Sequence, residues 1–327
     1  MFESDKLLDR INYEIRIRSE KFKTMQPAGL YSPVCYMLEM GGKRLRPMLL
    51  LNSYNLFSDS IDEAMPAALA IEVFHNFTLS HDDIMDKAEL RRNRLTVHKQ
   101  YSENSAILSG DVMAFLAYEF LMECNSEKII DIIRLFTKTA VEICEGQQLD
   151  IDFENRFNVT EEEYIEMIRL KTAVLLACCL KSGAMLAGAP CKIVEQLYEL
   201  GINIGLAFQL QDDLLDTFGN QEIFGKKIGG DILANKKTFL LVKALELSQP
   251  SVYKELMYWI NNVSCIPEEK IKAVHDIFLK LNIREIAENK IYHYCRKSIN
   301  VIEKIELDKT LKFHLESLID NMLKRNI

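Results

Sequence analysis

Apolar residues recur at three- and four-residue spacing along most of the chain, which is the pattern of helices that bury one face. In residues 161–188 this spacing follows three acidic residues and ends at a glycine, as expected for a helix start and stop. Residues 67–189 contain no proline, which favours successive long helices. No stretch shows β-type alternation of useful length. We therefore predict an all-α protein.

Breaks in the helical pattern predict loops near residues 26–34, 217–238 and 261–268. No low-complexity linker divides the chain, and no short repeat is evident. We therefore predict one domain spanning residues 1–327.

Composition and charge narrow the possible settings. The 327 residues are 48% hydrophobic and 27% charged, as in a large globular protein. A net charge of −8 argues against binding nucleic acid, because a phosphate backbone needs a basic face. No long uncharged apolar run occurs, and the start is charged throughout, so we expect neither a membrane span nor a signal peptide. Eight cysteines without a CxxC pair favour free thiols in a reducing cytoplasm.

Two acidic motifs of the form DDxxD follow apolar helical stretches: Asp82, Asp83 and Asp86, then Asp212, Asp213 and Asp216. In a helix the first and last aspartates of each motif lie about 40° apart, and the middle one lies about a further 100° round. Carboxylates on one face, with no cysteine in the motif, suit Mg²⁺ completed by substrate phosphates. One such motif alone is typical of a solvated acidic helix face, but two of them are not. A structural calcium site is a further alternative, but calcium loops need ligands at alternating positions of a turn, so the pair favours magnesium.

Three groups of cations stand out in this acidic chain. The first is in "GGKRLRP" at 41–47, the second is the pair Arg91 and Arg92, and the third is in "FGKKIGGDILANKK" at 224–237. Arginine binds phosphate through its planar fork, and lysine binds it as a point charge. Together with two acidic motifs, these cations predict a metal-bound diphosphate substrate.

The motifs "GGKRLRP", "HDDIMD…RR", "GQQLD", "LKTA", "FQLQDDLLD" and "GKKIGGD…NKK" occur in this order between residues 41 and 237. In this the chain resembles the trans-polyprenyl diphosphate synthases, the family of farnesyl and geranylgeranyl diphosphate synthases. The resemblance implies an isoprenoid synthase-type helical bundle around a deep central cavity, and a homodimer. It also implies Mg²⁺-dependent condensation of isopentenyl diphosphate with an allylic diphosphate.

The resemblance also implies roles for individual residues. Three Mg²⁺ ions would be held by Asp82, Asp86 and Asp212, with Asp83, Asp213 and Asp216 in support. Isopentenyl diphosphate would be bound by Lys43, Arg46, His75 and Arg92. The allylic diphosphate would be bound by Arg91, Lys171, Thr172, Gln209, Lys226 and Lys236. Of all these, Asp82, Asp86, Asp212, Lys171, Thr172 and Gln209 would act directly in catalysis.

Product length is expected to depend on the helix before the first motif. Phe77 lies five residues before Asp82, about 7.5 Å along a helix, and the next residue, Thr78, is small. In the family, an aromatic residue at the fifth position alone tends towards C20 products. We therefore expect geranylgeranyl diphosphate, with farnesyl diphosphate as the alternative.

The chain departs from the family pattern after the first acidic motif. The usual RRGxPT is "RRNRLT" here, and Asn93 should preserve the turn because asparagine tolerates left-handed backbone.

Three further functions share parts of this pattern. A terpene cyclase would lack the second DDxxD motif and "GGKRLRP", both of which this chain has. A head-to-head condensing enzyme is a second possibility. A non-catalytic synthase subunit is the third, but such a subunit should have lost acids or cations that this chain retains. The pattern as a whole favours a synthase that elongates an allylic diphosphate.

Overall fold

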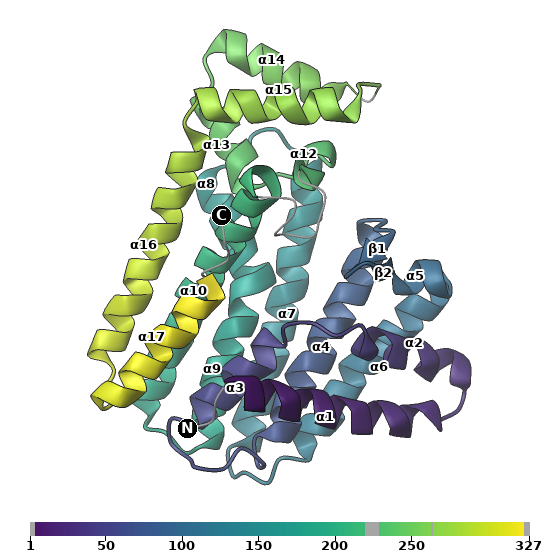
Figure 1. The fold of residues 1–327 in the computed structure, drawn as a ribbon, viewed down its shortest axis with the longest axis vertical. Coiled ribbons are helices and arrows are strands. Elements are labelled where there is room, and N and C mark those ends of the chain that lie inside the picture. The colour runs from purple at the N-terminus through teal and green to yellow at the C-terminus, as the bar shows by residue number, and fades with distance from the viewer. Residues whose placement is uncertain (1–3, 220–228, 263, 324–327) are drawn as a thin grey trace. The chain divides into compact units, whose positions relative to one another are not determined.

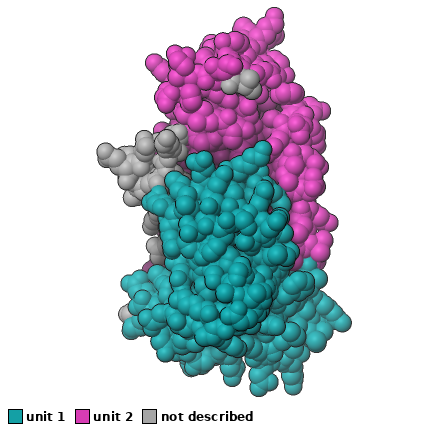
Figure 2. Space-filling view, turned by 90° about the vertical axis from the view of Figure 1, so that its right-hand side faces the viewer, with its two compact units in different colours: residues 1–137, 178–195 teal, residues 138–177, 196–327 magenta. Residues whose placement is uncertain are grey.

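The computed structural model describes residues 4–219, 229–262 and 264–323, and helices make up most of it (Figure 1). The chain forms two compact units, shown in two colours in Figure 2. Unit 1 comprises residues 1–137 and 178–195, and unit 2 comprises residues 138–177 and 196–327. The division falls within helices, and the expectation of one domain over residues 1–327 stays a prediction.

Unit 1 contains the N-terminal helices and a two-stranded hairpin. Its elements are α1 (Ser4–Lys23), α2 (Ala28–Glu39), α3 (Leu45–Tyr54), α4 (Met65–Met85), β1 (Leu90–Arg91), β2 (Arg94–Leu95), α5 (Val97–Gln100) and α6 (Glu103–Met122). Three helices belong partly to each unit: α7 (Ile129–Glu154), α9 (Val174–Leu186) and α10 (Cys191–Phe218).

Unit 2 contains the C-terminal helices and one π-helical turn. Its elements are α8 (Glu161–Ile168), the π-helix η1 (Arg169–Ala173), α12 (Gly230–Leu233), α13 (Phe239–Leu247), α14 (Pro250–Asn261), α15 (Pro267–Lys280), α16 (Ile283–Lys304) and α17 (Lys309–Leu323). In Figure 1, α14 lies beside α15, and α16 pairs with α17.

The all-α prediction is confirmed, and the details differ in three places. The loop predicted over 26–34 is wrong beyond residue 27, because α2 begins at Ala28 and accommodates a proline within it. The segment 161–188, predicted as one helix, is interrupted by η1. The hairpin of β1 and β2 was not predicted, because two-residue strands are too short to show alternation.

Helix α4 is buried along most of its length, because its first turns are apolar and pack against α3 and α6. Its buried stripe continues through polar residues at Asn76, Ser80 and Asp83, each at most 1% exposed. Helix α10 has a similar buried stripe, formed by Leu206, Leu210 and Leu214 in the core of unit 2. Both helices therefore end in an acidic motif that a packed core holds in place.

One described helix, α6, is long and apolar enough to cross a membrane by length and composition alone. Less than half of its most apolar window is buried. Core helices of soluble proteins pass the same test, so this is weak evidence for a membrane span.

Candidate active site

Two predicted phosphate ligands lie where α3 begins: Lys43 is in the loop before it, and Arg46 is in its first turn. Arg44, the N-cap of α3, anchors this segment. Arg44 is only 4% exposed and adopts a left-handed backbone, with φ of 48°. Its guanidinium donates to three acceptors, namely the Glu72 carboxylate on α4, the Leu38 carbonyl and the Asn12 side chain. Arg44, to which the resemblance assigned no role, is therefore a structural anchor.

Arg46 contacts His75, the histidine predicted to share its substrate. Arg46 Nη1 lies 3.0 Å from His75 Nε2. A guanidinium only donates, so Nε2 must accept, and the neutral ring carries its proton on Nδ1. Burial and the nearby charges of Arg46 and Arg92 hold the pKa of His75 well below its usual value. His75 thus orients Arg46 as a neutral acceptor.

Arg92 completes this group of cations. Its guanidinium donates to the Gly41 carbonyl and lies against Gly42, where a Cβ atom would stand 2.7 Å from Arg92 Cζ. Burial, with the neighbouring charges of Arg44, Arg91 and Arg46, lowers the pKa of Arg92. We call Arg44, Arg46, Arg91 and Arg92 the arginine cluster. Converging like charges of this kind favour binding of a polyanion.

The hairpin that carries Arg91 and Arg92 turns through Arg92 and Asn93. Both have positive φ, 52° and 60°, as in a type I′ turn. The strands pair Leu90 with Leu95 and Arg91 with Arg94. The prediction that Asn93 preserves the turn is confirmed.

The first acidic motif occupies the last turn of α4, with Asp86 as its C-cap. Carboxylates at this end face the negative pole of the helix dipole, and a bound cation relieves that repulsion. Asp83 is 1% exposed, and both its oxygens accept from Arg91 Nε, at 2.9 and 2.8 Å. The side chain of Asp82 is 23% exposed, and Asp86 is exposed. Asp83 therefore holds Arg91, and Asp82 and Asp86 are the less buried carboxylates of the motif.

The second motif lies in the last two turns of α10, in unit 2. Asp213 is 4% exposed and accepts hydrogen bonds from the Tyr164 hydroxyl, from Gln209 Nε2 at 3.1 Å and from the Phe239 amide at 3.1 Å. Burial raises the pKa of Asp213 to about 6, and these donors oppose the rise. Asp212 and Asp216 are only partly buried. Asp213 is thus an internal anchor, like Asp83.

Residues that follow α10 in the chain contact the second acidic motif. The Asp231 amide donates to Asp216 Oδ2 at 3.0 Å, and the Lys236 amide donates to the Asp231 carbonyl. Burial and the charges of Asp216 and Asp213 raise the pKa of Asp231 to about 7. This segment therefore adds a carboxylate and a lysine beside the second motif. The predicted ligand Lys226 lies outside the described residues.

The π-helix η1 presents the predicted residues Lys171 and Thr172. Lys171 Nζ donates to Asp150 Oδ2 at 2.6 Å, and Thr172 Oγ1 donates to Gln209 Oε1 at 3.0 Å. Helix α7 approaches closely at Gly146, where a Cβ atom would be 2.3 Å from the Lys171 amide nitrogen. π-Helical turns are frequent at functional sites. Thr172, Gln209 and the second motif thus form one hydrogen-bonded network.

Several residues that hold the predicted site residues in place were missed by sequence reasoning. Asp150 stands in the motif "GQQLD", which signalled it, and Asp231 stands in "GGD". Glu72 and Tyr164 carry no local signal, because their role arises only when distant segments meet.

The carboxylates of both motifs are hard oxygen donors, which suit Mg²⁺. Within residues 4–219, 229–262 and 264–323, no three histidine, cysteine or carboxylate groups are arranged to hold a metal ion unaided. Magnesium commonly binds through one or two carboxylates and takes its other ligands from water and substrate phosphate. The available residues therefore fit a metal that arrives with a diphosphate.

Comparisons with known proteins agree with this geometry. The polyprenyl synthetase family model matches residues 27–277. The chain is 40% identical over 244 residues to the geranylgeranyl diphosphate synthase of Methanosarcina mazei, covering 74% of this chain and 75% of that protein. It is 41% identical over 244 residues to the geranylfarnesyl diphosphate synthase of Natronomonas pharaonis, covering 69% and 72%. A crystal structure of a geranylgeranyl pyrophosphate synthase matches 100% of both chains, with 42% identity and a TM-score of 0.93. The chain therefore belongs to the polyprenyl synthetase family, has its all-α isoprenoid synthase fold and is a prenyltransferase.

Proposed function

We propose that this prenyltransferase condenses isopentenyl diphosphate with an allylic diphosphate to give geranylgeranyl diphosphate and inorganic diphosphate, with Mg²⁺ as cofactor. The observation that carries the proposal is the arginine cluster of unit 1, gathered around the buried His75 in a chain with a net charge of −8. Glu72 and Asp83 pair with Arg44 and Arg91, and the further guanidiniums of Arg46 and Arg92 beside a neutral histidine favour an anionic ligand with several oxygens. Lys43, Arg46, His75 and Arg92 would receive isopentenyl diphosphate.

We infer the metal ligands from the exposure of the aspartate side chains in each motif. Asp82 and Asp86 in unit 1, and Asp212 and Asp216 in unit 2, are less buried than the middle aspartates. We assign direct ligation to Asp82, Asp86 and Asp212, and we assign Asp83 and Asp213 to holding the motifs in place. Three Mg²⁺ ions would neutralise the allylic diphosphate and so make it a better leaving group.

In the proposed reaction, residues of the chain would bind the two diphosphates and stabilise the charges that form. As the C–O bond of the allylic substrate breaks, its electron pair leaves with the diphosphate, towards Arg91, Lys171 and Lys236. Thr172 Oγ1 donates its hydrogen bond to Gln209 Oε1, so its oxygen lone pairs are available to face the allylic cation. The alkene of isopentenyl diphosphate forms the new C–C bond. The departing diphosphate takes the proton whose loss restores the double bond.

Product length would be set on α4. The ring of Phe77 lies edge-on between Phe74, at a centroid distance of 5.3 Å, and His81, at 4.9 Å. Thr78 turns its hydroxyl back to the His75 carbonyl. Phe77 thus belongs to a packed aromatic row that a growing prenyl chain would have to displace. This supports a C20 product, with the C15 product as the alternative.

A second copy of the chain would complete the enzyme as a homodimer. The apolar residues Leu108, Phe115 and Met122 of α6 are 58%, 70% and 64% exposed. Their spacing of seven places them on one helix face, within about 20° per step. A partner helix packed on this face would also account for the apolar composition of α6. A cytoplasmic location stays a prediction.

The test is chain-length analysis of products made from radiolabelled isopentenyl diphosphate and Mg²⁺ with each allylic primer in turn. We expect a C20 diphosphate from C5, C10 and C15 primers. Release of an unphosphorylated hydrocarbon would indicate a terpene cyclase, and no incorporation would indicate a non-catalytic subunit.

The same assay on Phe77→Ala tests the length assignment. Removing the ring should extend the product beyond C20, because the aromatic row then opens by one side chain. Phe313→Ala is the control, since this ring of α17 is 65% exposed. An unchanged product length in Phe77→Ala would mean that another residue stops growth.

A further inference from the structure

The segment from Gly229 to Thr238, which we call the 229–238 loop, includes α12 and carries both Asp231 and Lys236. Its first end is fixed to the second acidic motif, because the Asp231 amide donates to Asp216 of α10. Its second end, where Lys236 lies, meets other helices of unit 2. The contacts there decide how the lysine is placed.

Lys270 of α15 reaches this second half. Its side chain is nearly buried, with the residue 5% exposed, and Nζ donates to Asn235 Oδ1 at 2.7 Å and to the Leu233 carbonyl at 3.4 Å. Both acceptors belong to the 229–238 loop, and neither is a carboxylate. Burying an ammonium group is costly unless it is hydrogen-bonded. The charge of Lys270 is thus committed to this loop.

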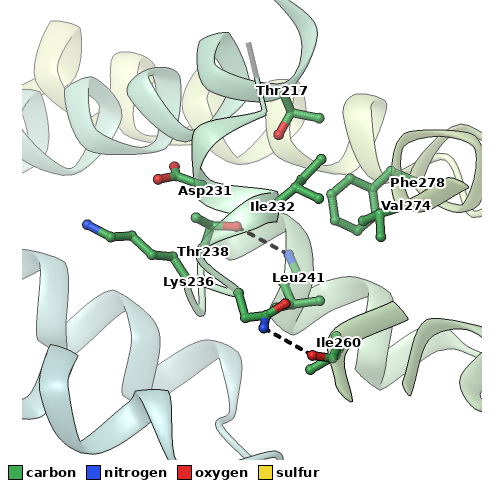
Figure 3. Close-up of a pocket in the computed structure, with 10 residues that line it drawn as sticks. Thr217, Asp231, Ile232, Lys236, Thr238, Leu241, Ile260, Val274 and Phe278 are labelled. Atoms are coloured by element: carbon green, nitrogen blue, oxygen red, sulfur yellow. Dashed lines mark hydrogen bonds between the residues drawn. The ribbon is translucent and has the colours of Figure 1, made fainter. Parts of the chain in front are cut away.

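The amide nitrogen of the Asn235 side chain bonds to α14. Its Nδ2 donates to the Ile260 carbonyl at 3.0 Å, the lower dashed line in Figure 3. Ile260 lies in the last turn of α14, where carbonyls lack a helical partner. The left-handed backbone of Asn235, with φ of 54°, aims the side chain at these two helices. One asparagine therefore ties the loop to α14 and α15 together.

The 229–238 loop packs against α15 through an apolar side chain. Ile232 faces Val274 and Phe278 of α15 around a cavity of only about 10 Å³, which is the room of roughly one water molecule. Asp231 and Lys236 line the same small cavity, and in Figure 3 their side chains extend away from Val274 and Phe278. The contact with α15 is therefore a support for the loop and not a ligand pocket.

We propose that Lys270 is a positioning residue that fixes Asp231 and Lys236 for the allylic diphosphate, acting through Asn235. The helices α14 and α15, which carry no catalytic motif, would thereby control binding of one substrate. This inference rests on the proposed function, which assigns Lys236 to the allylic diphosphate.

The experiment compares Lys270→Met with Lys272→Met in the full chain. Both remove a lysine from α15, but Lys272 is exposed. Lys270→Met should raise the KM for the allylic diphosphate about tenfold and leave the KM for isopentenyl diphosphate within about twofold. Lys270→Arg should recover part of this loss, and Lys272→Met should match the wild type. If Lys270→Met lowers only the Tm and kcat, or raises both KM values alike, the inference is wrong.

Asn235→Gly provides a second route, because glycine keeps the left-handed backbone while removing the acceptor. It should show the same selective KM change, and adding Lys270→Met to it should have little further effect. Independent, multiplying effects would contradict action through Asn235. A wild-type chain that makes no prenyl product would overturn the proposed function as well, whereas an active wild type with an unselective Lys270→Met overturns this inference alone.

Discussion

The two DDxxD motifs have the same letters and the same place at the end of a helix, but their middle aspartates are held differently. Asp83 in unit 1 is paired with a guanidinium, that of Arg91. Asp213 in unit 2 is held by neutral donors, the Tyr164 hydroxyl, the Gln209 amide and the Phe239 backbone. The first motif thus carries its own counter-charge, while the second lies beside a further acid, Asp231.

This difference shows how two copies of one motif come to have different electrostatic surroundings. In both helices the middle aspartate falls on the buried stripe, three residues after Ser80 in α4 and after Leu210 in α10. The helix period therefore decides that this residue anchors the motif. What the anchor binds is decided by the neighbouring segments. The arginine offsets the charge of Asp83, whereas the neutral donors leave Asp213 without a counter-charge, which suits the second motif to a cation.

The largest expected effect is the loss of turnover when a proposed metal ligand is removed. Asp82→Ala and Asp212→Ala should each lower kcat by about a thousandfold or more, because each removes charge that acts on the departing diphosphate. Steady-state assays at saturating Mg²⁺ would measure this. Asp276→Ala, at a side chain that is 62% exposed, is the control. Near-normal turnover in either motif variant would refute the metal assignment.

The next prediction concerns the stability of the two anchors. Arg91→Met leaves Asp83 buried without its counter-charge and should destabilise the fold by about 3–5 kcal/mol. Tyr164→Phe removes one of three donors to Asp213 and should cost about 1–3 kcal/mol. Urea unfolding of both variants gives the comparison.

A second substitution tests the cause of this difference. Adding Asp83→Asn to Arg91→Met should recover part of the lost stability, because the buried charge is gone. Equal losses in Arg91→Met and Tyr164→Phe would mean that the charge of the anchor is unimportant.

A smaller effect concerns which substrate each unit binds. Arg46→Ala should raise the KM for isopentenyl diphosphate by about tenfold to a hundredfold, the worth of one charge-assisted hydrogen bond. Lys236→Ala should do the same for the allylic diphosphate only. Arg94→Ala is a suitable control, since this arginine of the hairpin stacks on Tyr36. Equal changes for both substrates in either variant would show that the division is wrong.

Sequence reasoning reached the fold and the position of both motifs, because helix periodicity and motif spacing are local properties. It assigned no role to Arg44 of "GGKRLRP", since only the fold gives this arginine its partner Glu72. The π-turn at Lys171 was missed because close approach of Gly146 is a tertiary effect. Tyr164 and Lys270 lie far along the chain from the residues they hold, so no pattern marks them.

The smallest expected effect is the pH dependence that His75 of unit 1 contributes. The folded state holds the pKa of His75 well below its usual value near 6.5, so the unfolded chain binds this proton more readily. Stability from neutral His75 is therefore fully present above about pH 6.5 and is lost as the pH falls towards 5, by at most about 1.4 kcal/mol per pH unit. His75→Gln keeps an acceptor for Arg46 but cannot be protonated. Its Tm should therefore fall less than that of the wild type between pH 7 and 5, while His314→Gln, at an exposed ring, should follow the wild type throughout. Parallel Tm curves for His75→Gln and the wild type would mean that the arginine cluster does not depend on a neutral histidine, and the contrast between the two units would then rest on Arg91 and Tyr164 alone.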